Sequence, residues 1–209
     1  MKKYISFFTA ILLATSFLMA QTPEGRTRAT IIADALAQLP AANQTQYNRT
    51  MADLVSTGEE GLLELIGRMN PPGKNSNEVL DYAISGWTNF VANDETNRAI
   101  ATSAYEKALS QQFHNVIKAM IIRQLEKIGT DNNVQALSAF LTDERLAAPA
   151  AQALVSIGME NAMQALTNAL ANNPQESIKL NLVNALGQAG YEKAESLLIG
   201  ELAKNPSIE

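Results

Sequence analysis

A short motif that ends in glycine recurs along this chain and constrains its fold more than any other feature. A leucine stands four residues before a glycine in four segments, 53–58, 124–129, 153–158 and 185–190. On a helix, that leucine lies on the same face as residues one and two turns earlier, and glycine readily takes the left-handed conformation that ends a helix. Each segment therefore predicts the C-terminal end of an amphipathic helix.

Apolar residues with helical spacing resume after each of these glycines, as at Ala162 and Leu166. Gly129 and Gly158 are 29 residues apart, and Gly158 and Gly190 are 32 apart, which leaves room for two short helices and two turns. Aromatic residues make up only 6% of the chain, which favours packed helices over a β-sandwich. The sequence therefore predicts a repeated helix–turn–helix unit.

The spacing of these signals divides the chain into about five helix pairs and one further helix that has no partner. The predicted pairs are 24–39 with 43–57, 59–68 with 76–91, 95–110 with 115–128, 132–141 with 144–157, and 160–171 with 175–189. Asn43, Asn115 and Asn173 stand where side chains commonly cap the start of a helix. Gly86 falls inside the second helix of the second pair, so that pair departs from the motif.

Two of the predicted second helices open with the same pair of residues. Ile117-Lys118 and Ile178-Lys179 stand at the same distance before the terminal glycine. They resemble the hydrophobic–basic pair that opens the second helix of bacterial HEAT repeats of the phycobilisome-lyase-like type, and the ending Ala153-Leu-Val-Ser-Ile-Gly158 resembles the same family. The likeness is good over 115–203 and weak over 24–114, and the fourth pair departs from it at Leu146-Ala147, where the basic residue is missing.

This resemblance implies an all-α fold, a right-handed α-α superhelix of the HEAT/armadillo solenoid type that spans residues 21–209. The physical basis is general: a pair with apolar faces on both helices cannot cover itself, so neighbouring pairs stack and bury one continuous core. The resemblance also implies a scaffold that binds a protein partner on the concave surface formed by the second helices.

The first twenty residues have the pattern of a signal peptide. Lys2 and Lys3 precede an apolar stretch over 5–19, and Ala20 offers a small residue at the cleavage point. The alternative, a membrane anchor, is disfavoured because the stretch is shorter than the roughly 20 apolar residues that span a bilayer. We therefore expect an exported protein, periplasmic or secreted, with residues 1–20 removed and no stable membrane insertion afterwards.

The composition argues against several kinds of chemistry. The chain has no cysteine, which excludes disulfides, thiolate nucleophiles and cysteine-ligated metals. His114 is the only histidine, and it lies in a predicted turn without a matched nucleophile or carboxylate. The formal net charge of −5 argues against nucleic acid as a partner. We expect no enzyme activity, cofactor or metal, and the missing cysteine disfavours the tetrapyrrole chemistry of lyase-like relatives.

Three residues are candidates for contact with a protein partner. Trp87 would anchor a partner if it were exposed on the concave face, but its helical spacing from Leu80 and Val91 favours a place in the core. Lys118 and Lys179 are the basic members of the family-like pairs.

The end of the chain repeats an earlier segment. Leu202-Ala-Lys-Asn-Pro206 is similar to Leu170-Ala-Asn-Asn-Pro174, which leads into the closing helix of the fifth pair. The last predicted helix would leave apolar residues such as Leu197 partly uncovered. We expect the chain to be the front portion of a longer array, or the accessory region of an exported, sugar-acting enzyme whose catalytic domain lies beyond Glu209. The alternative is self-association or partner binding through this helix.

Overall fold

The chain is all-helical in the part that the computed structural model describes, residues 25–173 and 175–204. The predicted all-α class is confirmed. The predicted signal peptide and the repeat of the Asn-Pro pair at 205–206 lie outside the described residues. The helices are α1 Arg28–Ala37, α2 Gln44–Val55, α3 Gly58–Gly67, α4 Glu78–Val91, α5 Glu95–Leu109, α6 Asn115–Ile128, α7 Val134–Ser138, α8 Ala147–Ile157, α9 Glu160–Asn172, α10 Glu176–Ala189 and α11 Glu195–Lys204.

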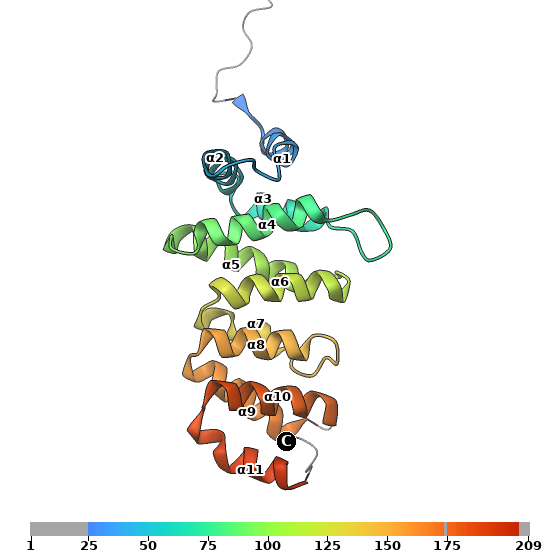
Figure 1. Ribbon diagram of the computed structural model, residues 1–209, viewed down its shortest axis with the longest axis vertical. Helices are drawn as coiled ribbons and strands as arrows, with labels where there is room; N and C mark the ends of the chain where they lie inside the picture. The colour runs from blue at the N-terminus through green and yellow to red at the C-terminus, as the bar shows by residue number, and fades with distance from the viewer. Residues whose placement is uncertain (1–24, 174, 205–209) are drawn as a thin grey trace, which may run out of the picture.

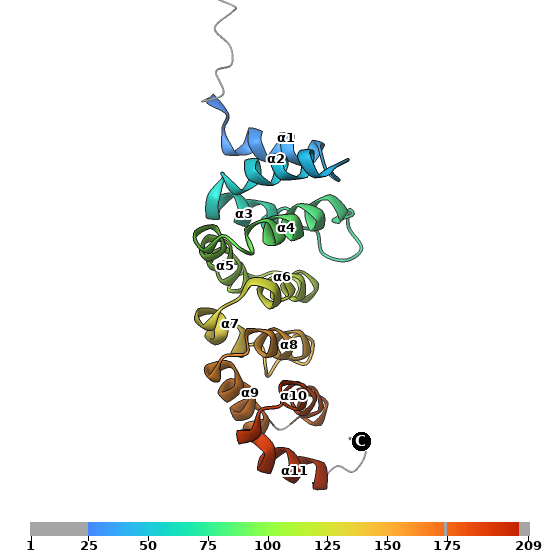
Figure 2. The same ribbon diagram turned by 60° about the vertical axis from the view of Figure 1, so that its left-hand side comes forward.

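The helices form an elongated stack in which consecutive helices pair, α1 with α2 through α9 with α10 (Figure 1). The second helices contact one another in order, α2 with α4, α4 with α6, α6 with α8 and α8 with α10. Among the first helices, α1 contacts α3, α3 contacts α5, and α7 contacts α9. Figure 2 shows α5, α7 and α9 along one side of the stack and α6, α8 and α10 along the other.

The leucine of the recurring motif lies in the core in every copy. Leu54, Leu125, Leu154 and Leu186 are each 0% exposed, which confirms that these segments bury the same helix face. The buried apolar residues form one cluster that runs from Ile32 to Ala194, through all five pairs. Burial of apolar area against the neighbouring pair is therefore what holds each pair in place.

The motif glycines do not all serve the same purpose. Gly58, Gly158 and Gly190 have φ of +64°, +67° and +60°, the left-handed conformation that the sequence predicts. Gly129 is different, because its backbone is extended, with φ −62° and ψ 159°. A Cβ there would overlap the Leu125 carbonyl oxygen and lie 3.3 Å from Ile157 Cδ1. The left-handed prediction is wrong at Gly129, where glycine is needed for space.

The helix starts agree with the predicted caps only in part. Asn43 caps α2, and its side chain accepts a hydrogen bond from Gln46 N at 2.9 Å. Asn115 is the first residue of α6, and the cap is His114, whose Nδ1 accepts from Val116 N at 3.2 Å. Asn173 accepts from the backbone of Gln175 at 3.0 Å and does not cap α10, which begins at Glu176.

The first helix of the fourth pair is shorter than predicted. The sequence favours a helix over 132–141, but α7 covers only Val134–Ser138, after a 3₁₀ turn at Asp131–Asn133. Turns occupy 139–146 before α8 begins. Asp143 stabilises that connection by accepting from the backbone of Arg145 at 2.8 Å and of Leu146 at 3.1 Å.

The last helix, α11, packs against α10 and leaves apolar side chains at the surface. Ile199 is 60% exposed and Leu202 is 40% exposed, as the sequence predicts for this helix, while Leu197 and Leu198 are partly buried. Within residues 25–173 and 175–204, no helix has the length and apolar character needed to cross a bilayer.

Candidate partner-binding surface

A groove of about 400 Å³ lies between two neighbouring second helices, α4 and α6. Asn77, Asp81 and Ser85 line it on the α4 side, one helical turn apart. The α6 side is a stripe of the same kind that includes Val116, Met120, Arg123, Gln124 and Lys127. Because side chains four residues apart share a helix face, each helix presents one continuous row of side chains to the groove.

The local sequence explains why these rows stay outside the core. In α6 the apolar residues Ile121, Leu125 and Ile128 are buried, and the groove stripe occupies the neighbouring face. Val116 opens the stripe and is 53% exposed. The groove therefore combines an apolar end with charged side chains along the rest of α6.

The groove carries charges of both signs. Burial raises the pKa of Asp81, and the positive charge of Arg123 across the groove opposes that rise. Arg123 Nε donates a hydrogen bond to its own helix at Ala119 O, 3.3 Å away. Within residues 25–173 and 175–204, none of Asp81, Arg123 and Lys127 belongs to an ion pair.

Gln124 is the most unusual residue in the groove because it is polar and only 4% exposed. Its Nε2 donates a long hydrogen bond to Met120 O at 3.4 Å. Its Oε1 is buried and has no hydrogen-bond partner in the described part of the chain. A buried acceptor without a donor costs about 1–3 kcal/mol of stability. Among the described residues, Thr50 Oγ1, Trp87 Nε1 and Asp131 Oδ1 are also buried without a partner, but only Gln124 lines this groove.

Trp87 lies in the core and not at the surface. Its side chain is 1% exposed, in agreement with the interpretation from helical spacing, and the alternative role as a partner anchor is wrong because the indole does not reach solvent. The indole N–H has no hydrogen-bond partner among the residues described.

The two lysines of the family-like pairs have different surroundings. Lys118 Nζ lies 5.6 Å from the centre of the Phe140 ring, a cation–π contact. Lys179 is 17% exposed and forms ion pairs with Glu201 at 3.2 Å and Glu176 at 3.5 Å. Its contacts therefore hold α11 against α10. The structure does not bring Trp87, Lys118 and Lys179 together, and none of them is among the described residues that line the α4–α6 groove.

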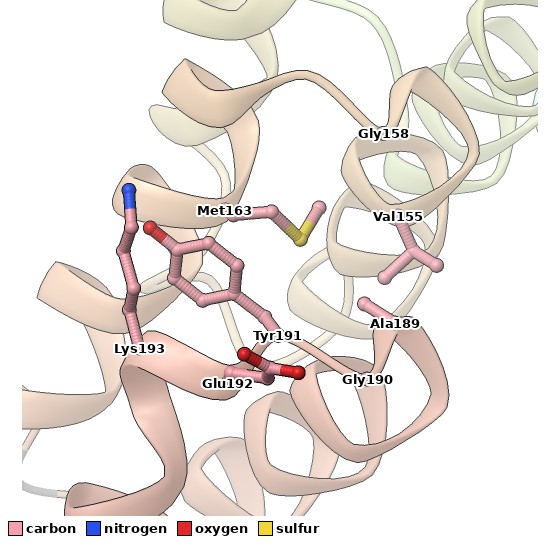
Figure 3. A pocket seen from close by; sticks show the side chains of 8 residues that line it. All are labelled: Val155, Gly158, Met163, Ala189, Gly190, Tyr191, Glu192 and Lys193. Carbon is pink, nitrogen blue, oxygen red and sulfur yellow. The ribbon is translucent and has the colours of Figure 1, made fainter.

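A second hollow, of about 370 Å³, lies between the turn after α8 and the turn after α10 (Figure 3). Val155 and Met163 form its apolar wall, and Tyr191 and Lys193 lie side by side at its edge. Glu160 accepts hydrogen bonds from the Tyr191 hydroxyl and from Lys193 Nζ, each at 2.7 Å. Hydrogen bonds from three side chains lower the pKa of the Glu160 carboxyl to about 2. The bond from Lys193 has the largest effect, followed by those from Tyr191 and Gln164. These polar groups satisfy one another, and their hydrogen bonds join the start of α9 to the turn between α10 and α11.

One residue of the groove, Gln124, could have been singled out from the sequence, although the recurring motifs do not point to it. Gln124 falls between Ile121 and Leu125, within the apolar stripe of α6, and a polar residue in such a stripe is a candidate for a specific role. Arg123 and Lys127 are one turn apart beside it. The pairing of this stripe with Asp81 of α4 has no signal in the sequence, because it depends on how two helices pack.

The comparisons with known proteins identify no relative: the sequence matches no protein-family model and no curated protein. The likeness to HEAT repeats stays a prediction from the motifs. Over the residues that the structure describes, no group of three or more histidine, aspartate and glutamate side chains is arranged to hold a metal ion.

Proposed function

We propose that this chain is an exported helical-repeat scaffold of the HEAT type, a right-handed α-α superhelix that binds a protein partner on the surface of its second helices. The single observation that carries the proposal is the α4–α6 groove, where a buried amide oxygen and three charged side chains have no hydrogen-bond or ion-pair partner across it.

The order of helix contacts supports the solenoid part of the proposal. Each second helix contacts the next second helix along the stack, which is the arrangement that nearest-neighbour repeat arrays share. Such an array presents an extended surface, and extended surfaces of this kind commonly bind other chains.

The chemistry of the surface favours a protein over other partners. The net charge of −5 opposes polyanions, while exposed Val116, in the same α6 row as Arg123 and Lys127, supplies the mixture of apolar area and charge that protein interfaces have. Support for an extracytoplasmic location comes from the signal-peptide pattern at 1–20.

The proposal is tested by placing a photo-crosslinking amino acid on each side of the stack. Exposed positions Asn89 and Val116 sample the second helices α4 and α6, and exposed positions Thr96 and Asn168 sample the first helices α5 and α9. After irradiation in a periplasmic or culture-medium extract of the host, we expect the second-helix positions to yield one common adduct. Adducts of equal yield from both sides, or none from any position, would overturn the proposal.

A further inference from the structure

The α4–α6 groove has the length of a short extended peptide. Its α6 row runs from Val116 to Lys127, eleven steps along one helix, which at the helical rise per residue corresponds to about 16 Å. An extended chain advances about 3.3 Å per residue, so about five residues of peptide would lie along this row. Figure 2 shows α4 and α6 as neighbours in the stack.

The groove contains both hydrogen-bond donors and hydrogen-bond acceptors that are unused within the described residues. Gln124 Oε1 and the Asp81 carboxylate can only accept, and neither has a hydrogen-bond donor in the part of the chain that the structure describes. Arg123 and Lys127 can only donate, and most of their N–H groups are unused there. A ligand that fits this groove must therefore offer donors and acceptors at close spacing.

An extended peptide meets this requirement, because its backbone N–H and C=O groups alternate and are not paired with one another. A helical peptide has already paired these groups internally, and a polyanion would bring only acceptors next to Asp81. We propose that the α4–α6 groove binds an extended peptide segment that carries an apolar side chain and, about two to four residues away, a carboxylate side chain. This inference rests on the proposed scaffold function and names the chemistry of its partner.

Each groove residue has a defined role in this complex. Val116 and Met120 receive the apolar side chain at one end, and Arg123 and Lys127 bind the carboxylate at the other. The Gln124 side chain turns toward the groove when the peptide binds, so that its Oε1, which is buried in the free chain, accepts a hydrogen bond from a peptide N–H between these two side chains. Asp81 lies on the α4 side and accepts from a second peptide N–H, which disfavours ligands without donors.

The probe is a synthetic peptide, Ser-Leu-Thr-Ser-Glu-Thr-Ser, with a neutral dye at its N-terminus and an amide at its C-terminus. Two further versions place the leucine and the glutamate two and four residues apart. Fluorescence anisotropy with the mature chain should show saturable binding of at least one version, weaker at high salt. If no version binds saturably, or if a version with lysine in place of the glutamate binds equally well, the inference is wrong.

A charge-matched pair of variants shows whether the binding is at this groove. The double variant Arg123→Ala, Lys127→Ala should weaken binding by about tenfold or more, because it removes both partners of the carboxylate. The control double variant Lys74→Ala, Arg145→Ala removes the same charge at exposed positions outside the groove and should bind as the wild type does. Equal affinity of the two double variants would exclude the groove as the site.

Gln124→Met separates a binding role from a structural role. Methionine removes the buried oxygen that lacks a donor, so the melting temperature should stay unchanged or rise, while peptide binding should weaken by about tenfold or more. A variant that is as stable as the wild type and binds equally well would contradict the assigned role of Gln124. If the photo-crosslinker adducts form but no peptide version binds, only the peptide inference fails; if the adducts are absent as well, the scaffold proposal fails with it.

Discussion

The hydroxyl of Tyr47 donates a hydrogen bond to the backbone carbonyl of Gly86, 2.9 Å away, and so joins α2 to α4. The contact depends on a close approach of the two helices. A Cβ at Gly86 would lie 2.8 Å from Met51 Sδ, so a side chain here would displace Met51. Gly86 therefore allows one helix pair to lie closely on the next, and this explains a glycine in the interior of a helix.

Loss of this hydroxyl should destabilise the fold by a small amount. Tyr47→Phe removes the hydrogen bond without changing the ring, so we expect a decrease of about 1 kcal/mol in the free energy of unfolding. Urea denaturation measured by circular dichroism gives this value. Tyr82→Phe is the matched control, because Tyr82 is also partly buried and its hydroxyl has no hydrogen bond in the described structure; equal losses in both variants would contradict the assignment.

Gly129 and Gly187 should respond in opposite ways to alanine. At Gly129 a Cβ would overlap the carbonyl oxygen of Leu125, which the helix backbone holds in place, so Gly129→Ala should destabilise the chain by about 1–3 kcal/mol. Gly187 lies inside α10 with no atom near the place of a Cβ, and Gly187→Ala should stabilise by about 0.5–1 kcal/mol. Thermal melts of both variants test this, and the same direction of change in the two would be inconsistent with the structure.

The carboxyl of Glu160 should make stability depend on acid pH. Lys193, Tyr191 and Gln164 lower its pKa to about 2 in the folded chain, from an ordinary value of 4.5. Because the folded pKa is the lower one, the stabilisation is complete above pH 4.5 and is lost as the pH falls from 4.5 towards 2. Glu160→Gln should therefore be less stable than wild type at neutral pH, with a difference that shrinks on acidification.

Chemical denaturation over a series of pH values measures this difference directly. Glu144→Gln is a suitable control, since Glu144 is exposed and forms no ion pair among the residues described. A difference for Glu160→Gln that does not change with pH would show that its carboxylate is not held by Lys193 and Tyr191 in solution.

The ion pair between Lys179 and Glu201 should determine how firmly α11 stays docked. Glu201 is 4% exposed, and Lys204 and Lys179 lower the pKa of its carboxyl. Lys179→Ala leaves this carboxylate without its buried partner, so the amides of α11 should exchange with deuterium faster. Lys204 is the control because its side chain is 67% exposed, and an exposed pair contributes less. If Lys204→Ala accelerates exchange as much as Lys179→Ala, burial of the first pair is not what holds α11.

The helices could be read from the sequence because their signals are local. Leu125 and Gly129 are separated by one helical turn, and the burial of the leucine follows from that spacing alone. The predictions failed at two places. α7 is shorter than its apolar pattern, and Gly129 is extended, with Ile157 Cδ1 of the next second helix 3.3 Å from the place of a Cβ, a contact that the local pattern does not contain.

The candidate surface was less predictable than the fold. Trp87 and Lys179 were candidate partner contacts, and both are engaged within the chain, Trp87 in the core and Lys179 with Glu201. Gln124 was visible as a polar residue in an apolar stripe, but its sequence position does not reveal whether a neighbour supplies a donor.

The sequence by itself determined the all-α class, the ends of most helices and the face that each helix buries. These properties depend on residues three or four positions apart, which interact within one helix. Only the tertiary structure decided that Asp81 of α4 faces Arg123 of α6, and that Gln124 Oε1 stays without a donor. Those facts depend on how two helices pack, which follows from the fit of all their side chains and from no single motif.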